Sequence, residues 1–212
     1  MATALTTSTA EFSIAKKTIY YASLLVSAVL SPVVLPAFTF SMILIADTTL
    51  TTDRKWLVWA VCLLSTTLVI SGYVMYLKMS GKVGSLDLDL RQERTKPFIV
   101  GLISNCAGFV AVSLLGAPPL VQWLMFCYCT STLLVQLITR RWKVSIHATS
   151  IGGAVVAWAF QFGAAAVAPW LILVPIVGIS RVVLHKHTTG QVIVGSLIGL
   201  CLTALQLRYF LR

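Results

Sequence analysis

The sequence predicts an all-α, polytopic integral membrane protein, a single-domain helical bundle with about six to seven transmembrane helices. Its 212 residues are 58% hydrophobic and only 10% charged, whereas soluble domains carry about 25% charged residues. The mean hydropathy is +0.92, and apolar runs recur at the length of about 20 residues that a helix needs to cross a bilayer. Because such a chain cannot cover itself with polar surface, we expect a lipid bilayer around it.

Seven apolar runs, separated by short polar or proline-containing segments, are the expected spans. They lie at about residues 19–45, 56–77, 97–115, 120–138, 145–167, 169–179 and 192–210. Pro32 and Pro36 are expected to kink the first span, and Gly195 and Gly199 give the last a face for close helix packing. We expect a single membrane domain over residues 1–212, in which residues 1–15 form a short N-terminal tail.

Charge is distributed unevenly over the two ends of the predicted bundle. The chain has 16 Lys and Arg against six Asp and Glu, a net charge of +10. With alternating spans, the polar segments 78–96, 140–143 and 180–191 all fall on one membrane face. The positive-inside rule makes that face cytoplasmic, in what we expect to be a bacterial inner (plasma) membrane. The charge favours contact with phospholipid, and no nucleic-acid partner is expected because no soluble basic domain exists to bind one.

The polar segment 180–191 is the most informative stretch, because it lies between two apolar runs. Cations and imidazoles that close to lipid mark a functional site. It contains Arg181 and His187, and two upstream segments on the same face supply Arg94, Lys96, Lys143, Ser145 and His147. Guanidinium groups bind phosphate oxygens in a fork, and lysine adds a point charge. One histidine can attack phosphorus while the other protonates the leaving oxygen, so the residues favour chemistry on a lipid phosphate.

The pattern of these residues resembles the type 2 phosphatidic acid phosphatase family. Ser180-Arg181, five residues, His187, three residues and then position 191 is similar to the third motif of that family, Ser-Arg-x5-His-x3-Asp. Ser145-x-His147 is similar to its second motif, Pro-Ser-Gly-His, with Val144 and Ile146 in place of Pro and Gly. In the first motif, Lys-x6-Arg-Pro, Lys96-Pro97 stands for Arg-Pro, and Asp89 stands where the Lys belongs. The resemblance covers residues 91–191.

The resemblance implies a role for each matched residue. His187 would be the nucleophile that forms a phosphohistidine, and His147 the general acid for the leaving group. Arg181 would bind phosphate, and the remaining phosphate contacts would come from Ser180, Ser145, Lys143, Arg94 and Lys96. The family needs no metal, and the odd set of five cysteines has no zinc spacing, so neither a metal nor a cofactor is predicted.

Gln191 is the departure that matters, because the family has aspartate there to orient the nucleophilic imidazole. Glutamine still accepts the ring N–H but carries no charge. Three readings stay open: a slow phosphatase, a phosphatase using another carboxylate (Asp87, Asp89 or Glu93), or a protein that binds or translocates a phospholipid without cleaving it.

The leading function is hydrolysis of a lipid phosphate monoester or diphosphate, with a polyprenyl phosphate or diphosphate, phosphatidic acid or phosphatidylglycerol phosphate as substrate. A transporter for a soluble ligand is less favoured, because the charges gather at one face and not at mid-membrane. The oligomeric state is not predicted.

Overall fold

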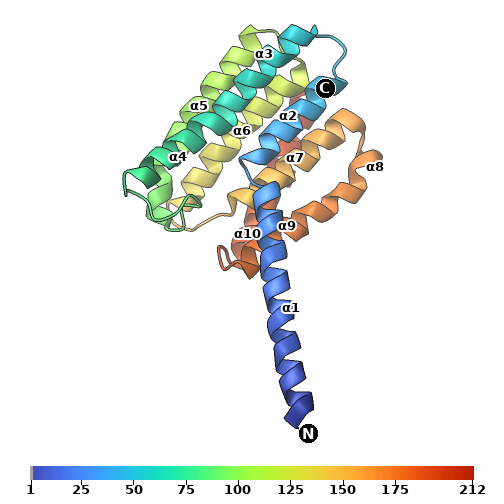
Figure 1. Cartoon of the computed structure of the whole chain (residues 1–212). Coiled ribbons are helices and arrows are strands. Elements are labelled where there is room, and N and C mark those ends of the chain that lie inside the picture. The colour runs from blue at the N-terminus through green and yellow to red at the C-terminus, as the bar shows by residue number, and fades with distance from the viewer. Residues whose placement is uncertain (1) are drawn as a thin grey trace.

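The computed structural model describes residues 2–212, with side chains from Ile14 onward. Over this range the chain is an all-α bundle without a β-strand, as predicted. Five of its helical segments are long and apolar enough to cross a membrane, or six if one bent pair of helices counts as a span. Most run side by side in Figure 1, which is the arrangement of a polytopic membrane bundle.

The bent pair is formed by α1 (Ala2–Val29) and α2 (Val34–Ala46), which meet at 51°. The break includes Pro32, so the predicted kink is present, while Pro36 fits into the first turn of α2. The expected N-terminal tail is different: residue 1 lies outside the described part, and 2–15 are helical. Figure 1 shows this part of α1 extending away from the bundle.

The next three spans lie close to their predicted positions. The first combines α3 (Thr52–Leu63), the π-helical turn η1 (Leu64–Leu68) and α4 (Val69–Met79). After a loop, the 3₁₀ turn η2 (Arg91–Arg94) leads into α5 (Thr95–Leu114), and α6 (Pro119–Thr139) returns antiparallel to it. The loop before η2 and the end of α6 therefore lie at the same end of the bundle.

The break between the fifth and sixth predicted spans lies earlier than expected. Helix α7 covers Ile146–Phe162 and ends at Gly163, whose φ of 91° suits glycine. The chain then returns through α8 (Ala164–Val167), the 3₁₀ turn η3 (Ala168–Ile172) and α9 (Leu173–Val183) as one apolar segment. Pro169 lies in the first turn of η3, where a missing N–H costs nothing, so it does not mark the break.

The last span, formed by α10 (Thr189–Leu197), η4 (Ile198–Leu202) and α11 (Thr203–Phe210), packs directly on α7. A Cβ atom on Gly199 would lie 2.2 Å from the carbonyl oxygen of Thr149, and one on Gly195 would lie 2.5 Å from that of Ser145. The predicted close-packing face is therefore used, and only glycine allows it. The Ser145 N–H also donates to the Gln191 carbonyl at 3.2 Å, which joins the starts of α7 and α10.

Candidate functional site

A cavity of about 630 Å³ opens among α1, α4, α5, α6 and α7. Its charged and imidazole side chains are Asp87, Arg94, His147, Arg181, Lys186 and His187. Much of the remaining lining is apolar, with Leu24, Ile70 and Phe98 among it. From Arg94 at the end of η2 to Asn105 in α5 the lining extends over about 16 Å, at the helical rise of about 1.5 Å per residue. The cavity therefore joins a cationic end to a long, mostly apolar interior.

The three basic segments predicted to share one face do meet at this end. The Lys143 ammonium donates to the Lys186 carbonyl at 2.9 Å and to the Asp89 carbonyl at 3.0 Å. Arg91 donates to the carbonyl of Arg140, which closes the same end on the side of α6. Residues far apart in the sequence thus surround one cavity opening.

The imidazole of His187 is held by Gln191. Nδ1 of His187 lies 3.0 Å from Oε1 of Gln191. The same Oε1 accepts the Thr188 backbone N–H at 3.3 Å, and the Gln191 N–H donates to Thr188 Oγ1 at 3.4 Å, a capping box at the start of α10. Because a backbone N–H can only donate, the Gln191 atom that faces it must be the oxygen. Nδ1 therefore carries the proton, and Nε2 of His187 keeps its free lone pair.

Arg181 lines the cavity and is only 3% exposed. Its Nη1 donates to Ser27 Oγ at 2.6 Å and its Nη2 to Asp87 Oδ2 at 2.9 Å. Its Nε is buried and has no hydrogen-bond partner among the described residues. Nε and Nη2 form one edge of the guanidinium, the edge that binds two oxygens of a phosphate or carboxylate. In this structure that edge is half-filled, by one oxygen of Asp87.

Arg94, the second buried guanidinium, is held entirely by backbone. It donates through Nε to the Leu88 carbonyl at 2.9 Å, through Nη1 to that of Val144 at 3.1 Å and through Nη2 to that of Asp87 at 3.3 Å. It is 2% exposed and lines the cavity. Arg94 thus contributes a fixed positive charge to the site and ties the 87–88 segment to the base of α7.

Two predicted site residues use their hydroxyl groups for local structure and do not line the cavity. Ser145 Oγ caps α7 by accepting the Ala148 N–H at 3.4 Å, because the first N–H groups of a helix lack partners within it. Ser180 Oγ donates to the Val177 carbonyl at 2.7 Å, one turn back in α9. Both side chains are buried, Ser145 completely.

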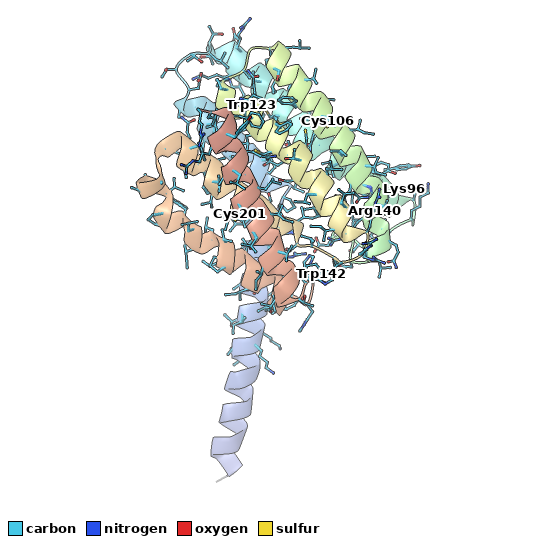
Figure 2. The ribbon with its side chains drawn as sticks, turned by 180° about the vertical axis from the view of Figure 1, so that it is seen from behind. Lys96, Cys106, Trp123, Arg140, Trp142 and Cys201 are labelled. Carbon is cyan, nitrogen blue, oxygen red and sulfur yellow. The ribbon has the colours of Figure 1, made fainter. Side chains whose placement is uncertain are left out.

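Two predicted lysines also lie outside the lining. Lys96 is exposed on α5, and Figure 2 shows it on the outer side of the bundle, on the same side as Arg140. Lys143 lies beside the cavity, where its ammonium is held by the carbonyls of Asp89 and Lys186. Of the predicted phosphate-binding residues, the structure brings Arg94 and Arg181 to the cavity itself.

The structure adds Ser27 and Lys186 to the lining, neither of which the motifs indicate. Ser27 follows Ser23 by four residues in an apolar helix, and both are less than 9% exposed. In the sequence, this pair of serines on one face of an apolar helix is the feature that could have indicated a polar site there. The His147 ring faces the Ser27 backbone and the carboxylate of Asp87, so α1 completes the site that α7 and α9 begin.

Burial and charge keep His187 neutral. Burial lowers its pKa to about 3, with the positive charges of Arg94 and Lys143 acting in the same direction. Burial pushes the pKa of Asp87 upward, but the charge and hydrogen bond of Arg181 outweigh it, and the pKa of this carboxyl is lowered. At neutral pH the site therefore holds an uncharged imidazole beside an ionised carboxylate–guanidinium pair.

No group of three His, Cys, Asp or Glu side chains in the described part of the chain is placed to hold a metal ion. Comparison with protein-family models gave no match, and searches of the curated proteins and of the solved structures gave no significant match either.

Proposed function

We propose that this membrane protein hydrolyses a lipid phosphate monoester or diphosphate through a phosphohistidine intermediate. One observation supports this most: a neutral His187, with Nε2 unprotonated, shares the charged end of a mostly apolar cavity with His147 and with Arg181, whose phosphate-binding edge is half-filled. The substrate class is a polyprenyl phosphate or diphosphate, phosphatidic acid or phosphatidylglycerol phosphate.

The reaction begins with the phosphate on the Nε–Nη2 edge of Arg181, while Arg94 supplies a second positive charge. Nε2 of His187 attacks phosphorus, so a P–N bond forms as the P–O bond to the lipid breaks. His147 takes up a proton together with the arriving phosphate anion, whose negative charge stabilises the imidazolium, and gives that proton to the leaving oxygen; it then accepts a proton from the water that hydrolyses the phosphohistidine. His187 is thereby restored, and inorganic phosphate leaves.

The cavity supports a lipid substrate over a soluble phosphate ester. Its mostly apolar lining continues to about 16 Å beyond Arg94, by the helical rise, and this interior suits a hydrocarbon tail. We place the protein in a bacterial inner membrane with the cationic end cytoplasmic, because most of the lysines and arginines lie there.

A second candidate function is phospholipid binding or translocation without cleavage. The neutral Gln191 favours it, since no carboxylate among the described side chains contacts His187: Asp87 pairs with Arg181, and Asp89 pairs with Lys186. An imidazole that lacks a negatively charged partner is a weaker nucleophile, and the cationic phosphohistidine that it forms is less stable.

Phosphate release by the purified protein tests the proposal. We expect release from at least one lipid phosphate in a panel of the substrates above, with EDTA present, and loss of release in His187→Ala. His185→Asn is the matched control, because His185 is exposed and has a φ of 53°, a conformation that asparagine tolerates. A folded protein that releases no phosphate from any lipid would move the assignment to the binding function.

A further inference from the structure

A short acidic loop closes the cationic end of the cavity. We call residues 83–90 the acidic strap. Its backbone and carboxylates bind the cations of three other segments: Arg94 through the carbonyls of Asp87 and Leu88, Lys143 through the carbonyl of Asp89, and Lys186 through the Asp89 carboxylate at 2.8 Å. The strap thus binds cations that a phosphate group would otherwise contact.

The contact between Asp87 and Arg181 has the geometry of an anion in the phosphate position. Asp87 Oδ2 lies 2.9 Å from Nη2 on the edge of Arg181 that binds oxyanions, while the neighbouring Nε has no partner among the described residues. A carboxylate bound through one oxygen leaves half of that edge empty. A phosphate can fill both positions, so it makes one strong hydrogen bond more than Asp87 does.

Asp87 can leave Arg181 without unfolding the strap. Leu88 and Val83 are buried against Val74 and Leu77 of α4, which anchors the strap backbone. The Asp87 side chain is 38% exposed, in contrast to the 4% of Arg181. Lys186 Nζ lies 4.0 Å from the same Oδ2 and offers the displaced carboxylate a second cation. A side-chain rotation is therefore enough to move the negative charge from one cation to the next.

We propose that the Asp87 carboxylate is a built-in competitor that occupies the phosphate position on Arg181, and that a phosphate group displaces it toward Lys186. Asp87 thereby lowers the affinity of the site for phosphate and the occupancy of the site by weakly bound anions. This inference rests on the phosphate site of the proposed function, but it requires only that the site binds phosphate and not that it cleaves a lipid.

Inorganic phosphate binding to the full-length protein in detergent tests the competitor. A ligand that binds the folded state raises the unfolding temperature with its concentration, so phosphate titrations at constant ionic strength give a Kd for each variant. We expect Asp87→Asn to bind phosphate about tenfold more tightly than the unchanged chain, a gain of about 1.4 kcal/mol. Asp89→Asn removes the same charge from the same strap and frees Lys186, but it leaves the Arg181 contact intact. Because Lys186 is partly exposed and its charge is screened by solvent, the Kd of this variant is expected to fall by less than about threefold.

Three outcomes overturn the competitor: no tighter binding in Asp87→Asn, weaker binding there, or an equal gain in Asp89→Asn. The second would assign Asp87 to positioning Arg181, and the third would be a general charge effect. If Asp87→Asn does not fold, Asp87→Ala is measured under the same criteria. Because no turnover is needed, a protein that never releases phosphate from a lipid can still show the tighter binding, and the two proposals fail separately.

Discussion

Nδ1 of His187 and Oε1 of Gln191 are 3.0 Å apart, and the backbone N–H of Thr188 points at the same oxygen from 3.3 Å. The glutamine thus does one part of the task expected of an aspartate, since it fixes the tautomer and the direction of the imidazole. It leaves out the other part, because it brings no negative charge to stabilise a cationic phosphohistidine. In a serine-protease triad the aspartate does both, and the matching neutral substitution costs about 10⁴ in rate by leaving the wrong tautomer. Gln191 avoids the wrong tautomer, because it presents its oxygen to Nδ1 of His187.

Adding the missing charge should therefore raise the rate. Gln191→Glu keeps the side-chain length and the contact with Nδ1, and it places a carboxylate beside the imidazole. We expect kcat to rise about tenfold, which corresponds to about 1.4 kcal/mol of transition-state stabilisation. Phosphate release under saturating lipid measures it. Gln191→Leu is the control that loses the hydrogen bond as well, and its kcat should fall; a Glu variant no faster than the unchanged chain contradicts this account of Gln191.

His187 should stay neutral throughout the physiological range. Its pKa of about 3 follows from burial and from the nearby cations, so its imidazole signal in a ¹³C-histidine NMR titration should not shift between pH 5 and pH 8. His187→Ala assigns the signal. Since the unfolded histidine titrates near 6.5, the unfolded state binds more protons between the two values, and this residue lowers stability as the pH falls from 6.5 toward 3. A titration midpoint near 6.5 would show that the site is open to water.

A larger side chain in the cavity should discriminate between substrates by tail length. A Cβ on Gly101 would lie 3.0 Å from Cδ1 and 3.3 Å from Cγ1 of Ile70 and 4.0 Å from Cγ2 of Thr132, all side-chain atoms, so Gly101→Leu can be accommodated on α5 by a shift of Ile70 while it fills space in the cavity. We expect KM for a long-chain lipid phosphate to rise about tenfold, with kcat for a short-chain analogue within about twofold of the unchanged value, since the loss of about two buried CH₂ groups of the tail costs about 1.6 kcal/mol. An equal loss for both substrates would place the tail outside this cavity.

The packing of α10 and η4 on α7 should be intolerant of a single methyl group. Gly199→Ala would force a Cβ to within 2.2 Å of the Thr149 carbonyl oxygen, and such overpacking costs about 1–3 kcal/mol. Thermal unfolding in detergent should show a lower midpoint. Gly72→Ala is the matched control, because nothing lies within 4 Å of its added Cβ. If Gly199→Ala is as stable as the control, the helices are not in backbone contact here.

The fold class and the convergence of the basic segments could be predicted because both follow from local pattern. Apolar runs of the right length give helices, and the alternation of spans then places Arg94, Lys143 and Arg181 at one end. The position of the break after α7 could not be predicted from the local pattern, because both Gly163 and Pro169 are residue types that can end a helix. A proline also fits into the first turn of a new helix, which is where Pro169 lies.

The side chains around His187 and His147 were predictable only in part. Motif spacing led to the two histidines, to Arg181 and to Gln191. It also led to Ser145 and Ser180, whose hydroxyl groups are engaged by the backbone of their own helices. Ser27 and the Arg181–Asp87 pair depend on how α1 and the acidic strap fold over the cavity, at sequence separations of 154 and 94 residues, which no local pattern reports.

The most direct test of the central claim is to trap the covalent intermediate. The protein is mixed with its ³²P-labelled lipid phosphate, quenched in alkali, which preserves phosphohistidine, and digested for mass spectrometry. The account predicts a phosphate on His187 and on no other histidine, absent in His187→Asn and present in His185→Asn. Phosphate release without any label on His187 would contradict it, and would mean that water attacks the lipid phosphate directly.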